Sequence, residues 1–184
     1  MAKSNTVVRS MHDLGLAAWF GGTLMGVVGL NGAAEEAGSQ TTTARISGSG
    51  WNKWAPVNAA AIGVHLIGGA GVLNANRKRA AVQKGVTANT VAKLAVTGAA
   101  LAATAYIRVL GKKIDTDVAA APGTPDQLPG DAQKAQRQMH VLQWSLPVLT
   151  GVLEVLNADQ GEQQRPGQQL LGIAQRAGDL VGIG

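Results

Sequence analysis

Two long stretches of the chain contain no charged residue, and they constrain its fold more than any other feature. Residues 14–34 (LGLAAWFGGTLMGVVGLNGAA) and 55–76 (APVNAAAIGVHLIGGAGVLNAN) lack Asp, Glu, Lys and Arg. A helix of about 20 apolar residues is long enough to cross the hydrocarbon core of a bilayer. A helix on the surface of a soluble protein would show a polar stripe instead, whereas Thr23 and Asn31 are the only polar side chains of residues 14–34. Both stretches therefore predict membrane-spanning helices.

Two further stretches predict spans with shorter uncharged cores. Residues 90–110 contain the run LAVTGAALAATAYI between Lys93 and Arg108, whose long side chains can reach towards the lipid headgroups. Residues 138–156 contain the run QMHVLQWSLPVLTGVL, which Glu154 closes. We therefore expect an all-α integral membrane bundle of four transmembrane helices. A soluble helical protein is the alternative, because the mean hydropathy is only +0.08, but Gly, Ala and polar connections account for that low value.

The last residues, 158–184, are expected to follow the transmembrane domain (1–157) as a polar linker and an amphipathic tail. Pro166 and Gly167 break any continuing helix. Apolar residues then recur at helical spacing, at Leu170, Ile173, Ala174, Ala177, Leu180 and Val181. This pattern predicts a short amphipathic C-terminal helix that lies on the membrane surface, binds a partner or docks on its own bundle.

The distribution of basic residues predicts the orientation of the bundle. The leader carries Lys3 and Arg9. The connection 77–93 is more basic, with Arg77, Lys78, Arg79, Lys84 and Lys93. Because short cytoplasmic connections are enriched in Lys and Arg, we expect both termini in the cytoplasm, with Arg77, Lys78 and Arg79 as the main topology determinants. The first apolar run is too long for the core of a signal peptide, about 7–15 residues, and is expected to remain as a span.

The net charge of +5 is explained by this topology bias. The chain shows no basic surface interleaved with aromatic residues of the kind that holds a nucleic-acid strand. The expected partner is therefore the lipid bilayer and not a nucleic acid.

Two tryptophans precede the second span. Trp51 and Trp54 flank Lys53 at the end of the connection 35–54. Trp and Lys at this position are typical of an anchor at the membrane–water interface. An aromatic platform for a ligand is the alternative.

Small residues predict how the helices pack. Gly22 and Gly26 form a GxxxG pair in the first span, and Gly29 follows three residues later. Such residues let helix backbones approach closely where lipid removes the hydrophobic driving force. Packing within the bundle is the first expectation, and a homo-oligomeric interface through the same face is the alternative. Four amides should hydrogen-bond between helices: Asn31, Asn58, Asn74 and Gln143.

Histidine offers the main candidates for a cofactor or metal, since the chain has no Cys. His65 lies midway along the second span and is a weak cofactor candidate, while the pair Met11 and His12 is compatible with copper. A common site of two histidines is not expected, because His12 and His140 should lie at opposite faces and His65 near the midplane. We predict no resident cofactor, with copper, haem or quinone as the alternative. No catalytic constellation is present, and no enzyme activity is expected.

The first span also carries a resemblance to a known family. The stretch His12-Asp-Leu-Gly-Leu-Ala-Ala-Trp19-Phe-Gly-Gly22 resembles the opening helix of the copper-resistance protein D family and of related four-helix bacterial membrane domains of unknown function. Lys93-Leu-Ala, with Arg108 farther along, is similar to their third helix. The fourth span departs from that pattern, with Met-His and a proline where a basic entry belongs. The resemblance implies a bacterial plasma-membrane domain and, through His12 and Met11, copper handling.

The sequence as a whole predicts a non-catalytic membrane protein, an accessory or structural subunit of a membrane complex with a protein partner or a second copy of itself. The alternative is a protein that handles a small ligand or ion, namely copper, haem or quinone. These two hypotheses differ in whether the chain contains a built binding site.

Overall fold

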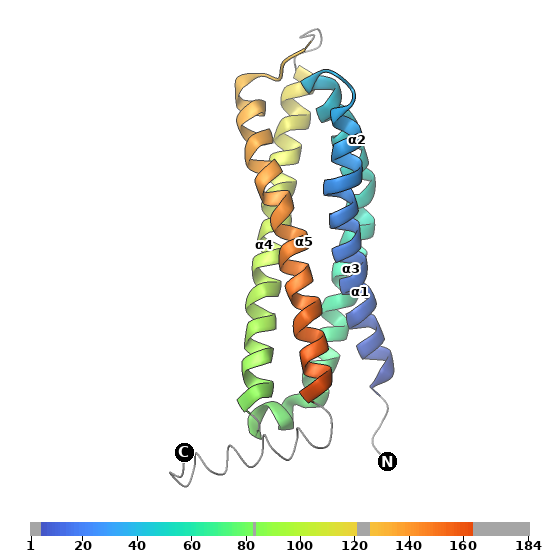
Figure 1. Ribbon diagram of the computed structural model, residues 1–184, viewed down its shortest axis with the longest axis vertical. Helices are drawn as coiled ribbons and strands as arrows, with labels where there is room; N and C mark the ends of the chain where they lie inside the picture. Colours follow the sequence, from blue (N-terminus) through green and yellow to red (C-terminus); the bar gives the residue numbers. More distant parts are fainter. Residues whose placement is uncertain (1–4, 83, 121–125, 164–184) are drawn as a thin grey trace.

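The computed structural model describes residues 5–82, 84–120 and 126–163, and these residues form helices without any strand. The elements are α1 (Thr6–Met25), the π-helical turn η1 (Gly26–Leu30), α2 (Asn31–Glu35), α3 (Gln40–Val82), α4 (Lys84–Ala120) and α5 (Gly130–Gln163). α1, η1 and α2 follow one another without a break and act as one rod (Figure 1). The all-α fold class is confirmed. The expected amphipathic helix in 158–184 falls largely outside the described residues.

Four helical segments are long and apolar enough to cross a membrane. They are Thr6–Glu35, Gln40–Ala75, Thr87–Ala120 and Gly130–Asp159. Each expected span lies inside one of α1–α2, α3, α4 and α5. The prediction of four spans from the uncharged runs is thus confirmed by length and composition.

The helices extend well beyond those runs. α3 has 43 residues and is therefore about 64 Å long at 1.5 Å per residue, against a hydrocarbon core of about 30 Å. Most of the segment 35–54, expected as a loop, belongs to this helix. Its small residues pack: Thr41 and Ser47 are buried, and Ala44 lies in a core cluster with Leu110. Such tertiary packing stabilises a helix that local propensity does not favour.

The rods run antiparallel and form two closely packed pairs, α1 with α3 and α4 with α5 (Figure 1). α1 and α5 join the pairs, whereas α3 and α4 make fewer contacts with each other. The described chain begins and ends at the same end of the bundle (Figure 1). The side of the bundle between α3 and α4 is therefore its most loosely closed side.

Two apolar clusters hold the bundle together. One joins α1, α4 and α5 through Leu16, Trp19, Ala100 and Leu153. The other lies nearer the α4–α5 connection and contains Ala44, Leu110, Ile114, Val118, Leu128, Ala132, Ala135 and Met139. The two clusters lie at different positions along the length of the bundle, and a cavity lies between them.

Glycines set the distance between α1 and α3. A Cβ atom at Gly15 would lie 2.5 Å from the backbone nitrogen of His65, and one at Gly68 would collide with the backbone of His12. Gly22 and Gly26 lie against the indole rings of Trp54 and Trp51. Gly29, expected on the same face, has only Met25 of its own rod within 4 Å of that position. Close approach of the backbones is what small residues permit between membrane helices.

Candidate functional site

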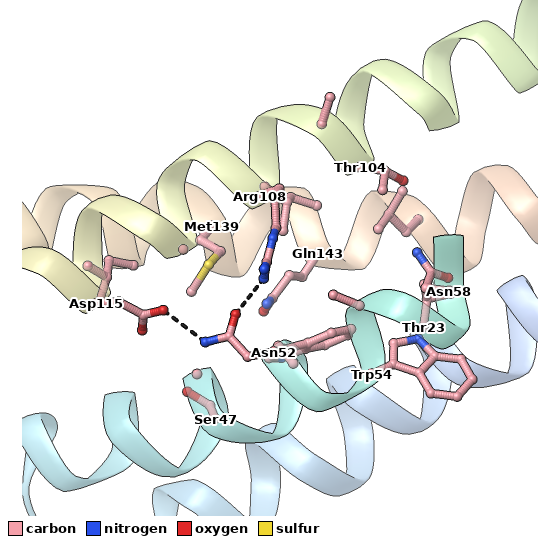
Figure 2. A pocket seen from close by; sticks show the side chains of 18 of the residues that line it. Thr23, Ser47, Asn52, Trp54, Asn58, Thr104, Arg108, Asp115, Met139 and Gln143 are labelled. Atoms are coloured by element: carbon pink, nitrogen blue, oxygen red, sulfur yellow. Dashed lines mark hydrogen bonds between the residues drawn. The ribbon is translucent and has the colours of Figure 1, made fainter. Parts of the chain in front are cut away.

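A cavity of about 370 Å³ lies between α3, α4 and α5, with α1 closing its inner end (Figure 2). This volume falls in the range of ligand pockets, roughly 300–1,000 Å³. Most of its wall is apolar, formed by residues that include Ala55, Ala59, Ile62, Leu101, Ala105 and Met139. The cavity lies on the loosely closed side of the bundle, between α3 and α4.

Charged and amide side chains meet at one end of this cavity. Asn52 of α3 donates a hydrogen bond from Nδ2 to Oδ2 of Asp115 at 2.9 Å, and its Oδ1 accepts one from Nη1 of Arg108 (Figure 2). Arg108 and Asp115 are two turns apart on the same face of α4. Asn52 therefore bridges an anion and a cation across the gap between α3 and α4. Ionisable side chains in a membrane span are costly and point to a functional site by default.

Unsatisfied polar atoms mark the deeper wall. Asn58 is only 9% exposed, and its Oδ1 has no hydrogen-bond partner among the described residues. Nε1 of Trp54 and Oε1 of Gln136 likewise have no hydrogen-bond partner among the described residues, and both residues line the cavity. A buried polar atom left without a partner costs about 1–3 kcal/mol. A ligand with matching polar groups would remove part of that cost.

The amides of Asn31 and Gln143 make hydrogen bonds between helices. Nδ2 of Asn31 donates to Oε1 of Gln143 at 2.8 Å, and Oδ1 of Asn31 accepts from Nε1 of Trp51 at 2.9 Å. This chain of bonds joins α2, α3 and α5 beside the cavity. The expectation that Asn31 and Gln143 bond between helices is therefore met, whereas Asn74 is exposed and Asn58 lacks a partner among the described residues.

The two tryptophans lie within the bundle contact. The rings of Trp51 and Trp54 pack on Gly26 and Gly22 of the first rod, and both residues line the cavity. The two rings are therefore part of the contact between α3 and the first rod and of the cavity wall. Because α3 begins at Gln40, Trp51 lies about three turns and Trp54 about four turns inside the helix.

His12 and His65 form a reciprocal pair between α1 and α3. Nδ1 of His12 lies 3.0 Å from the carbonyl oxygen of His65, and Nδ1 of His65 lies 2.9 Å from that of His12. Their rings are stacked with centroids 4.1 Å apart and planes inclined by 17°. Trp19 meets His65 edge to face at 6.2 Å. Each histidine is followed three residues later by the glycine that touches the other helix, Gly15 or Gly68.

This pairing corrects the expectation that the histidines lie at different depths. That expectation placed His12 at the membrane surface and His65 at the midplane, each measured from its own apolar run. The helices begin earlier than those runs, at Thr6 and Gln40, and the glycine contacts fix how α1 and α3 slide past each other. His12 and His65 consequently share one depth.

The rings of the histidine pair are not arranged as in a bis-histidine haem site. In a bis-histidine haem the two rings face the iron from opposite sides, whereas these rings lie face to face. Among the described residues, no group of three His, Asp or Glu could hold a metal ion. Met11 is half-buried, and His140 is exposed.

The topology residues lie in the last turns of α3. Arg77 is exposed, and Lys78 and Arg79 follow it in the helix. This end of α3 lies at the end of the bundle where α1 begins (Figure 1).

Sequence reasoning did not identify the bridge of Asn52, Arg108 and Asp115. Arg108 closes the third apolar run of the sequence, and Asp115 lies beyond the expected span 90–110. The available signal was the spacing of seven residues between Arg108 and Asp115, which places opposite charges on one face if the helix continues. α4 does continue, to Ala120.

Comparison with protein-family models, with curated proteins and with solved structures finds no match to this chain. The resemblance to the copper-resistance protein D family thus stays a prediction, and the candidate site is argued from its geometry.

Proposed function

We propose that this chain is a membrane-embedded binding protein for a small amphipathic molecule, which occupies the cavity between α3, α4 and α5. The observation that carries the proposal is Asn58, a 9% exposed amide on the cavity wall whose Oδ1 has no partner among the described residues. This is the ligand-handling hypothesis. It is favoured over a purely structural subunit because a protein that only packs would gain by replacing Asn58 with an apolar residue.

The cavity specifies the class of ligand. Its apolar wall suits a hydrocarbon or ring body, and the polar groups near Asn52, Arg108 and Asp115 suit a head group that accepts and donates hydrogen bonds. Both properties together describe a lipid-soluble molecule with one polar end. We propose no catalytic step for this site.

Filling the cavity tests the proposal. Ala105 lines the cavity, and Ala102 of the same helix is exposed and does not line it. Ala105→Phe should remove any small molecule that co-purifies with the chain, as measured by native mass spectrometry from detergent micelles. Ala102→Phe, the matched control, should retain it.

The proposal fails if the wild-type chain carries no small molecule and binds none from a lipid extract. It also fails if Ala105→Phe and Ala102→Phe retain the same ligand equally. Recovery with a fixed set of protein partners and no ligand would instead support the accessory-subunit hypothesis.

We further propose a bacterial plasma membrane as the location, with both termini in the cytoplasm. The basic end of α3 at Arg77, Lys78 and Arg79 supports this orientation. Replacing these three residues by Glu should disturb insertion. Single introduced cysteines report the topology cleanly because the chain has none of its own, and an unaltered labelling pattern in the Glu variant would count against the orientation.

A further inference from the structure

A second, smaller cavity of about 240 Å³ lies along the same α3–α4 side, beside the histidine pair. Its wall contains His12 and His65 together with Thr90, Lys93 and Thr97, and apolar side chains complete it: Leu66, Leu73, Leu94, Ala70 and Val72. It shares no lining residue with the larger cavity. It is therefore a separate candidate site.

The hydrogen bonds of the pair fix the protonation of both rings. Nδ1 of each histidine faces a backbone carbonyl oxygen, which can only accept a hydrogen bond. Both Nδ1 atoms must therefore carry a hydrogen. In a neutral imidazole the other nitrogen, Nε2, is then an acceptor.

Neither acceptor is used within the described chain. Among the described residues, none donates a hydrogen bond to Nε2 of His12 or His65. His65 is 2% exposed, so bulk water is not its natural partner. Both histidines line the apolar cavity, so a ligand there can donate a hydrogen bond to such an acceptor.

We infer that this cavity binds a hydroxyl-bearing apolar ring compound, of the hydroquinone class, in which one hydroxyl donates a hydrogen bond to Nε2 of one histidine of the pair. The ring would occupy the apolar wall. Lys93 and the hydroxyl of Thr97 lie in the same wall and suit an oxygen at the far end of the ring. Among the residues that the structure describes, no acidic side chain lines the cavity, and the ammonium group of Lys93 opposes a bare metal cation. The inference concerns binding and includes no redox step.

The test uses histidine labelled with ¹⁵N in the full chain, purified in detergent micelles, and two probes. A short-chain alkyl hydroquinone can donate to Nε2, whereas its dimethyl ether has the same ring and no hydroxyl. In the free protein both His12 and His65 should show Nδ1–H tautomers. The hydroquinone should shift the Nε2 signal of at least one of the two histidines, and the ether should shift neither. Exposed His140 is the internal control.

Cavity-filling variants locate the binding. Ala70 lines the smaller cavity, whereas Ala60, on the same helix, is exposed and lines neither this cavity nor the larger one. Ala70→Phe should weaken hydroquinone binding at least tenfold, and Ala60→Phe and Ala105→Phe should not. Loss with Ala105→Phe alone would place the probe in the larger cavity and overturn this inference, while leaving the proposed function intact.

Two further results would overturn it. One is the absence of any Nε2 shift at saturating hydroquinone. The other is an equal shift with the dimethyl ether, which would mean that ring burial and not the hydroxyl controls binding. Ligand loss from the larger cavity in the Ala105→Phe variant is measured separately, so each proposal can fail alone.

Discussion

Substitution of Gly15 by alanine should destabilise the bundle, although alanine is the better helix former. The new Cβ would lie 2.5 Å from the backbone nitrogen of His65 and 2.6 Å from the carbonyl oxygen of Ala61, whereas ordinary contact begins at 3.4 Å. The obstructing atoms are backbone, so α1 and α3 must separate by about 1 Å. That movement would break the two bonds between His12 and His65, now 3.0 and 2.9 Å long.

The magnitude follows from these losses. Overpacking costs about 1–3 kcal/mol, and each interhelical hydrogen bond in a membrane contributes about 0.6 kcal/mol. The gain in helix propensity from Gly to Ala is up to about 1 kcal/mol. We therefore expect Gly15→Ala to lower the free energy of unfolding by about 1–3 kcal/mol.

Gly21 provides the matched control on the same helix, because nothing lies within 4 Å of the position its Cβ would take. Gly21→Ala should leave stability unchanged or raise it by up to about 1 kcal/mol. Unfolding in mixed micelles with increasing sodium dodecyl sulfate, followed by far-ultraviolet circular dichroism, measures both variants. Equal stability of Gly15→Ala and Gly21→Ala would refute the backbone contact between α1 and α3.

The same unfolding assay tests two other contacts. Leu153 is 1% exposed and Val152 is 43% exposed. Leu153→Ala should lower the free energy of unfolding by about 2 kcal/mol, near the lower end for core truncations because lipid contributes little transfer energy. Val152→Ala should lower it far less. A comparable loss in both would contradict the assignment of Leu153 to the core. Asn31→Leu should cost about 1 kcal/mol, because it leaves Oε1 of Gln143 and Nε1 of Trp51 unpaired. Adding Gln143→Leu should recover part of that loss, and a purely additive double variant would argue against the bond.

Local sequence patterns were sufficient for the positions of the four spans. An uncharged run such as 14–34 must avoid water along its whole length, and this requirement is a property of the run itself. The close approach of Gly22 and Gly26 to α3 follows a similar local rule. The helical state of residues 40–54 was not accessible in this way, since Thr, Ser and Gly there form a helix by packing against neighbouring helices.

The candidate sites depend on contacts between distant segments. Asn58 was recognised from the sequence as a buried amide in need of a partner, but the cavity beside it is built by α3, α4 and α5 together. Arg108 and Asp115 become neighbours of Asn52 only when α4 continues past the apolar run and lies against α3. The residue types alone do not indicate that Arg108 and Asp115 hydrogen-bond to Asn52.

An all-helical chain with four apolar spans, basic residues after the second span and close-packing glycines could be predicted from local patterns, because each property depends on residues a few positions apart. The stacking of His12 and His65 at one depth depends on how the helices pack. Depth in an antiparallel pair depends on how far one helix slides along the other. That offset is set by side chains meeting backbone across the contact, as at Gly15 and Gly68, and no local pattern encodes it.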